Sequence, residues 1–207
     1  LQGSIELKKV WSGTGGQTTL NIGTSANGHQ IAQQQTGADG AGPLTTGPNA
    51  VNTGDYYVSE SGGLADYDAD LSCVSGNKTD TDGVVSVADG ENWVCTYTNT
   101  RKQGTIELKK AWSGTPGTTT IKIGTAVASG NVASVDINGA GGTTGENKVD
   151  TGTYYVSETA VSDYTTGLVC TVDGSEVTPV NGVAVQVVSG KKTVCTYTNT
   201  RKQGTIQ

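Results

Sequence analysis

The chain has 207 residues, a formal net charge of −6, 33% hydrophobic residues and neither Phe nor Met. Small domains with so little apolar material usually need covalent or other reinforcement. The acidic balance, with no basic cluster beyond short pairs, argues against a nucleic-acid-binding protein. No apolar run has the length of a membrane span, so we expect no such span in this chain.

Repetition divides the sequence into two parts. The residues from Cys95 to Ile106 read CTYTNTRKQGTI, and those from Cys195 to Ile206 read the same letters. An identity of this length indicates a tandem repeat with a period of about a hundred residues, the size of a small domain. We expect one domain over residues 1–101, a second over 102–203, and the start of a following repeat at 204–207. The chain would then be a window from a longer array.

Short alternating runs of Val, Ile, Thr and Tyr, separated by Gly, Asn and Asp, are typical of an all-β sandwich or barrel. In chain order, the strands of the first domain are expected at 4–11, 18–22, 30–34, 55–60, 69–74, 84–87 and 93–98, with a long loop over 36–52. Those of the second are expected at 106–112, 119–123, 132–137, 153–158, 167–172, 183–188 and 193–198. Only residues 100–103 remain as a linker, which predicts two tandem domains in a fairly stiff rod.

The cysteines occur two per repeat at matching places. Cys73 and Cys95 correspond to Cys170 and Cys195, which favours one disulfide within each domain and an oxidising, extracellular compartment. Closing a loop of about twenty residues would stabilise a domain by about 3 kcal/mol. A metal site is the competing interpretation, but two thiols per repeat and the single His29 cannot complete a repeated four-ligand site. We expect no metal and no cofactor.

Strand phase directs three polar side chains toward the predicted core of each domain. Residues two apart share a face of a strand, so Lys9 is in phase with Ile5 and Leu7, Glu60 with Tyr56 and Val58, and Asn99 with Cys95 and Tyr97. The second domain has the same trio at Lys110, Glu158 and Asn199.

Buried charges are expensive unless they are paired, and burial lowers the pKa of a lysine and raises that of a glutamic acid. A neutral lysine amine is a nucleophile, an asparagine carboxamide is an electrophile, and a protonated glutamic acid can move protons as ammonia leaves. The trio therefore predicts an intramolecular Lys–Asn isopeptide bond, with Glu60 and Glu158 as the assisting acids. The competing interpretation is a Lys9–Glu60 salt bridge, with Asn99 capping the end of its strand.

Three short motifs in the same order in both repeats resemble a known family. The IELKKVW opening (IELKKAW in the second repeat), the YYVSE strand and the TYTN closing strand are similar to the collagen-adhesin B-type, or prealbumin-like, repeats of bacterial surface adhesins and pilins. The resemblance implies an immunoglobulin-like or prealbumin-like sandwich. It also implies spontaneous isopeptide bonds from Lys9 to Asn99, assisted by Glu60, and from Lys110 to Asn199, assisted by Glu158. The cysteine pair departs from the familiar pilins.

Other patterns are weaker. The acidic runs at 66–70 and 80–82 suggest a calcium loop, but the second repeat keeps only Asp163, so we interpret them as solvated loops. We expect Trp93 to pack in the core rather than to bind a sugar. His29 has no Ser, Cys or Asp arrangement around it, and we expect no enzymatic activity.

The function predicted from these patterns is structural. We expect a repeat of an extracellular bacterial surface fibre, stalk or pilus-like adhesin, whose partners are neighbouring copies or repeats of the same protein. The alternative is an adhesive module that binds a glycan or host protein through the irregular loops 24–52 and 125–148.

Overall fold

A computed structural model describes residues 1–206. The chain separates after Lys102 into two compact parts, called here unit 1 and unit 2. Both are built from strands, and a single short 3-10 turn, η1 (Ala38–Gly40), lies in unit 1. No helix among the described residues is long and apolar enough to cross a membrane.

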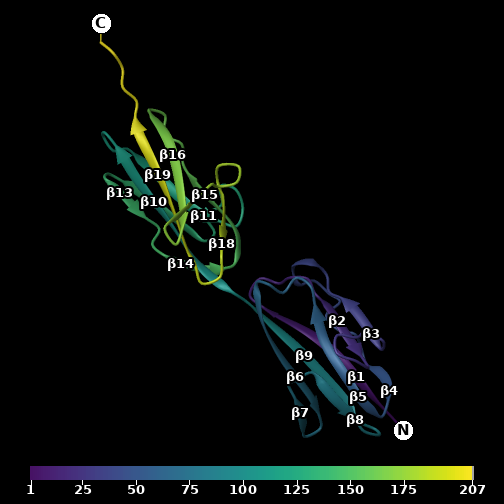
Figure 1. Ribbon diagram of the computed structural model, residues 1–207. Helices are drawn as coiled ribbons and strands as arrows, with labels where there is room; N and C mark the ends of the chain where they lie inside the picture. The colour runs from purple at the N-terminus through teal and green to yellow at the C-terminus, as the bar shows by residue number, and fades with distance from the viewer. Residues whose placement is uncertain (207) are drawn as a thin grey trace. The chain divides into compact units, whose positions relative to one another are not determined.

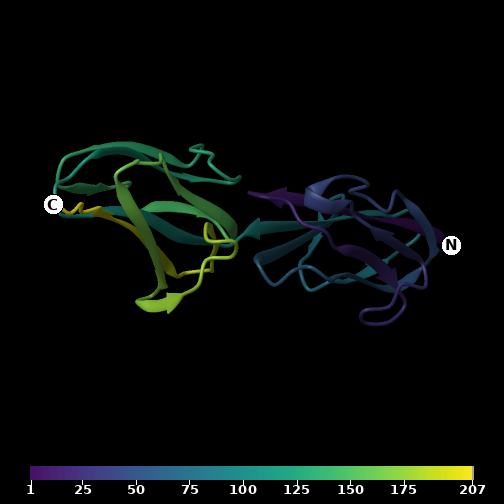
Figure 2. The same ribbon diagram turned by 90° about the horizontal axis from the view of Figure 1, so that it is seen from above.

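Unit 1 has two sheets that face each other (Figures 1 and 2). The five-stranded sheet has the order β4-β1-β9-β6-β7, and the four-stranded sheet has the order β3-β2-β5-β8. The strands are β1 (Gln2–Ser12), β2 (Thr19–Gly23), β3 (Ala32–Gln35), β4 (Asn49–Asn52), β5 (Gly54–Ser61), β6 (Tyr67–Ser75), β7 (Lys78–Asp80), β8 (Val84–Val87) and β9 (Asn92–Arg101).

Unit 2 repeats this topology. One sheet has the order β13-β10-β19-β16-β17, with β14 also pairing with β10, and the other has the order β12-β11-β15-β18. The strands are β10 (Gln103–Ser113), β11 (Thr118–Gly124), β12 (Ala133–Asn138), β13 (Gly141–Thr143), β14 (Asn147–Asp150), β15 (Gly152–Glu158), β16 (Tyr164–Val172), β17 (Ser175–Val177), β18 (Ala184–Val187) and β19 (Lys192–Arg201).

The first and last strands of each unit are parallel neighbours. In unit 1, β1 pairs with β9 from Ser4, opposite Asn92, to Ser12, opposite Thr100. The strands β10 and β19 pair in the same way in unit 2. Every other named pairing is antiparallel. The parallel pairing therefore places the first strand of each unit directly beside its last strand.

Alternation along the strands fills the space between the two sheets. Each core combines apolar residues of both sheets with a pair of cysteines. In unit 1 it includes Ile5, Leu7, Leu20, Ile22, Val58, Val85, Cys73, Cys95 and Trp93; in unit 2 it includes Ile106, Leu108, Ile121, Ile123, Val156, Val185, Cys170 and Cys195. Trp93 is only 4% exposed, which confirms the prediction that it packs in the core.

Several short strands escape the sequence prediction. The expected loop 36–52 contains β4, whose Val51 is buried and which pairs with the start of β1. The acidic run at 66–70 was interpreted as a solvated loop that ends where the expected strand 69–74 begins, but β6 already starts at Tyr67 and includes Asp68. The strands β7, β13, β14 and β17 have three or four residues each, too few for an alternating pattern to stand out from a turn.

Candidate functional site

The candidate site of unit 1 begins on β1. Ile5, Leu7 and Lys9 are buried, whereas the side chain of Lys8 is 45% exposed and lies beside Glu6. The regular alternation without a bulge places Lys9, and not Lys8, on the inner face. Unit 2 repeats the arrangement on β10, where Lys110 is only 4% exposed.

A buried ion pair joins the two sheets at this point. Nζ of Lys9 lies 3.5 Å from Oε2 of Glu60 on β5, and the two side chains are 0% and 3% exposed. In unit 2, Nζ of Lys110 lies 3.2 Å from Oε2 of Glu158 on β15, with side chains 0% and 6% exposed. Removing one partner of such a pair leaves an uncompensated buried charge and typically costs 3–5 kcal/mol.

The third member of the trio lies on the last strand. Asn99 is 0% exposed, and neither Oδ1 nor Nδ2 of its side chain has a hydrogen-bond partner among the described residues. Asn199 of unit 2 is in the same state. A buried polar group without a partner costs about 1–3 kcal/mol, so two such carboxamides at matching positions require an explanation. Among residues 1–206 they make no hydrogen bond that would cap a strand end.

The amine of Lys9 reaches across to the strand that carries Asn99. Nζ donates hydrogen bonds to the backbone oxygens of Val10 and Tyr97, both at 3.2 Å. Tyr97 is paired in register with Lys9 and precedes Asn99 by two residues on the same face. Lys9 and Glu60 therefore meet inside the unit from β1 and β5, and Asn99 faces the same interior from β9, two residues beyond the backbone oxygen that Lys9 contacts.

Burial changes the proton affinities at the site. It lowers the pKa of Lys9 below the ordinary value of a lysine, because desolvation outweighs the opposing effect of Glu60. The pKa of Lys110 is lowered for the same reason. Desolvation and the charge of Glu158 raise the pKa of Tyr197 to about 12. The lysine shifts favour the neutral amine, which is the nucleophilic form.

The two units differ at one position next to the carboxylate. In unit 2, the hydroxyl of Thr166 donates a hydrogen bond of 3.1 Å to Oε1 of Glu158. The equivalent residue of unit 1, which pairs with Asn99 across β6 and β9, is Ala69 and has no hydroxyl. Among residues 1–206, neither carboxylate oxygen of Glu60 has a hydrogen-bond donor, and its charge is compensated by the ion pair with Lys9.

Aromatic residues lie around the site, although the sequence did not lead us to assign them to it. Nζ of Lys9 lies 4.3 Å from the ring centroid of Trp11, and Nζ of Lys110 lies 4.2 Å from that of Trp112. Trp11 packs edge-on against Tyr67 at 4.8 Å. The Lys-x-Trp spacing, present in both repeats, is the sequence signal that could have assigned these tryptophans.

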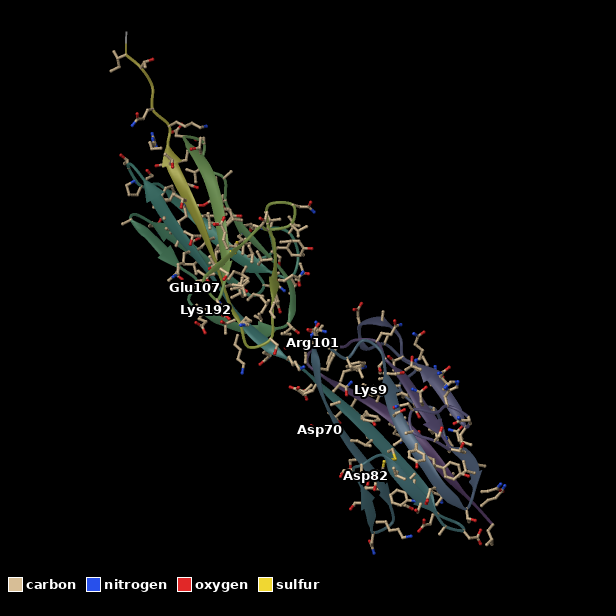
Figure 3. All side chains as sticks on the ribbon, in the orientation of Figure 1. Lys9, Asp70, Asp82, Arg101, Glu107 and Lys192 are labelled. Atoms are coloured by element: carbon tan, nitrogen blue, oxygen red, sulfur yellow. A yellow bond between two sulfur atoms is a disulfide. The ribbon has the colours of Figure 1, made fainter. Side chains whose placement is uncertain are left out.

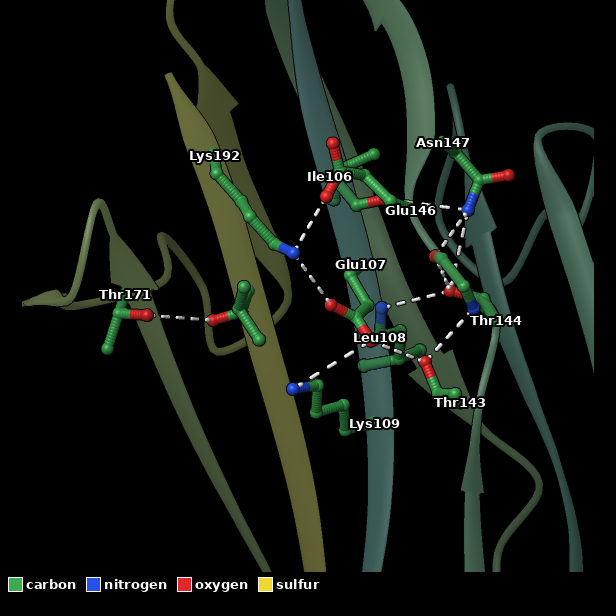
Figure 4. Close-up of polar contacts among 12 residues, drawn as sticks. Ile106, Glu107, Leu108, Lys109, Thr143, Thr144, Glu146, Asn147, Thr171 and Lys192 are labelled. Carbon is green, nitrogen blue, oxygen red and sulfur yellow. Dashed lines mark hydrogen bonds and ion pairs between the residues drawn. The ribbon is translucent and has the colours of Figure 1, made fainter.

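Other charged groups lie outside this site. In unit 2, Lys192 bridges Glu107 and Glu146 at 3.3 and 2.7 Å (Figure 4). A hydrogen bond from Thr143 and the nearby lysines lower the pKa of Glu107. Asp70 and Asp82 of unit 1, labelled in Figure 3, are exposed, whereas Lys9 is buried. No group of His, Cys, Asp and Glu among residues 1–206 is arranged to hold a metal ion.

The predicted disulfides are present. Cys73 bonds to Cys95 and Cys170 to Cys195, each between neighbouring strands of the sheet that contains the parallel pair. Sequence separations of 22 and 25 residues make each a link within one unit.

Comparison with known proteins agrees with this architecture. Residues 3–97 match a family described as a prealbumin-like fold domain. Unit 1 is therefore a prealbumin-like domain, which confirms the resemblance found in the motifs, and unit 2 repeats its topology.

Two solved structures are similar over nearly the whole chain. One is the major pilin T-13 of Streptococcus pyogenes, with a TM-score of 0.51, 15% identity and 97% of each chain covered. The other is the major pilin T3.2 of Streptococcus pyogenes, with a TM-score of 0.49, 16% identity, and 96% of this chain and 98% of that chain covered. At this identity, the first likeness supports the fold alone. No curated protein matches the chain significantly.

Proposed function

We propose that the chain is a structural part of an extracellular bacterial surface fibre, and that each unit closes itself with a Lys–Asn isopeptide bond. The observation that carries the proposal is the carboxamide of Asn99, which is fully buried and has no hydrogen-bond partner among the described residues, in the same interior as the buried Lys9–Glu60 pair. The same state recurs at Asn199. The pilins with a similar fold supply the expectation of a fibre built from neighbouring copies.

The reaction follows from the three side chains. Transfer of a proton from the ammonium group of Lys9 to Glu60 leaves a neutral amine and a neutral acid. Nζ then bonds to Cγ of Asn99, and the bond from Cγ to Nδ2 breaks. Of the two protons on the attacking nitrogen, one stays on the new amide and one passes through Glu60 to Nδ2, which leaves as ammonia. No oxidant or cofactor is required.

The proposed bond lies on the path that tension takes through a unit. A pull along the chain enters unit 1 at β1 and leaves at β9, and Lys9 and Asn99 lie on these two strands. The parallel pairing means that such a pull shears the two strands past each other along the whole register. A covalent bond between them would transfer the load and shield the rest of the unit, as a tension-bearing stalk or fibre requires.

Intact mass of the reduced and denatured chain tests the proposal. The unaltered chain should lack the mass of two ammonia molecules, and Lys9→Ala or Lys110→Ala should each restore one. Lys8→Ala, which changes the exposed neighbour, is the matched control and should keep both losses. An unaltered chain with its full mass would refute the crosslinks and leave the disulfides as the covalent links of the units.

A further inference from the structure

Each site includes a tryptophan at the same place relative to the trio. Trp11 follows Lys9 by two residues on β1 and pairs in register with Asn99 on the neighbouring strand. Side chains of register partners lie on the same side of a parallel pair, so the indole and the carboxamide are neighbours. Trp112 and Asn199 form the same pair in unit 2.

The indole N–H is a buried donor without an acceptor. Nε1 of Trp11 and Nε1 of Trp112 are both buried and have no hydrogen-bond partner among the described residues. Buried indole N–H groups usually find an acceptor, whereas here a donor without a partner and a carbonyl oxygen without a partner occupy adjacent register positions in both units. Neither the core packing nor the Lys9–Glu60 ion pair explains this coincidence.

The ring is held in place from its other side. Trp11 packs against Tyr67, whose hydroxyl donates to the backbone oxygen of Thr14 at 2.9 Å and accepts from Nη1 of Arg101 at 2.7 Å. Arg101 also pairs with Asp66 at 3.2 Å. Lys9 and Arg101 lie toward the same end of unit 1 (Figure 3). In unit 2, Trp112, Tyr164, Arg201 and Asp163 repeat the arrangement.

We propose that Trp11 and Trp112 assist the crosslinking reaction, their rings covering the lysine amine and their indole N–H groups donating to the asparagine side-chain oxygen. This inference rests on the proposed function. When Nζ bonds to Cγ, the carbonyl electrons move onto Oδ1, and a donor at that oxygen stabilises the developing charge. When the bond from Cγ to Nδ2 breaks, the carbonyl re-forms and keeps Nε1 as its donor. Hydrogen bonds of this kind are often long before reaction and shorten as it proceeds.

The test is the rate of ammonia loss from newly made chains. Pulse-labelled chains of the full sequence are sampled over time, and the crosslink in each unit is quantified from intact mass and from linked proteolytic peptides. Trp11→Phe keeps an aromatic ring over the amine but removes the N–H. Loss of one donor of this kind typically slows a reaction about a hundredfold or more, so we expect unit 1 to slow at least tenfold. Unit 2 of the same molecule is the internal control, and Trp93→Phe is the control for a buried tryptophan elsewhere.

A second measurement leaves Trp11 itself in place. In the unaltered chain, hydrogen exchange at the indole N–H of Trp11 should be slow, and Lys9→Ala, which cannot form the bond, should make it faster. Equal crosslinking rates in Trp11→Phe and the unaltered chain, or equal exchange of that N–H with and without the bond, would overturn the role of the tryptophan alone. An unaltered chain that loses no ammonia would overturn both proposals.

Discussion

Pulling on the two ends of the chain tests the proposed load path in unit 1. The perturbation is Asn99→Leu, which removes the electrophile but keeps a side chain of similar volume and leaves the Lys9–Glu60 ion pair in place. Because the carboxamide of Asn99 has no hydrogen-bond partner among residues 1–206, this change breaks no hydrogen bond described there. The variant therefore separates the loss of the crosslink from damage to the fold.

The expected lengths follow from the positions of the links. With a bond from residue 9 to residue 99, about 90 residues carry no tension, which is about 315 Å of chain at roughly 3.5 Å per residue. In Asn99→Leu the disulfide still holds 22 residues, or about 75 Å. The variant should therefore release about 240 Å from this segment, and a reducing agent should add about 75 Å more.

Single-molecule force spectroscopy on the two-unit chain measures these lengths. The unaltered chain should show no long extension from either unit, and Asn99→Leu should show one, with unit 2 as the internal control. Asn199→Leu should show the reciprocal event, with 25 residues held by its own disulfide. An unaltered chain that extends by about 240 Å per unit without reduction would refute the load path.

Three further predictions concern stability and chemistry. Asn99→Leu should lower the melting temperature of unit 1 in calorimetry if the crosslink forms; an equal or higher value would contradict the crosslink, because removing a buried polar group without a partner is by itself neutral or stabilising. Glu158→Gln should abolish ammonia loss in unit 2 and leave that of unit 1 intact in mass spectrometry, and unchanged loss in unit 2 would exclude the acid role. Above pH 10 the unfolded chain releases a phenolic proton that folded Tyr197, with its pKa of about 12, still binds, so the free energy of unfolding should fall by on the order of 2 kcal/mol up to pH 12. Denaturant titration should show a smaller fall in Tyr197→Phe than in the unaltered chain. An equal fall in both would contradict the burial of this phenol.

Much of the site could be predicted from the sequence because strand phase is a local property. Lys9 lies two residues after Leu7 and four after Ile5, and a strand without a bulge buries all three. The same argument placed Glu60 and Asn99 in the interior. The cysteines were paired correctly because each repeat contains only two.

The parts that escaped prediction depend on contacts distant in the sequence. Nothing in the local pattern of β1 shows that its neighbour is β9, about ninety residues later. Without that pairing, Trp11 and Asn99 cannot be placed side by side. The strand β4 was missed because its few residues contain a single buried apolar side chain, Val51, and owe their strand form to pairing with β1.

The parallel pairing of β1 with β9 also bears on the order in which a unit can be made. A ribosome delivers β1 first and β9 last, so the five-stranded sheet of unit 1 lacks the strand between β1 and β6 until nearly all residues of the unit have been synthesised. Contacts of such high sequence separation form late and slowly. The earlier strands of a nascent unit must therefore stay soluble until β9 is available to pair with them. The Thr-, Asn- and Gly-rich composition of this chain favours that solubility.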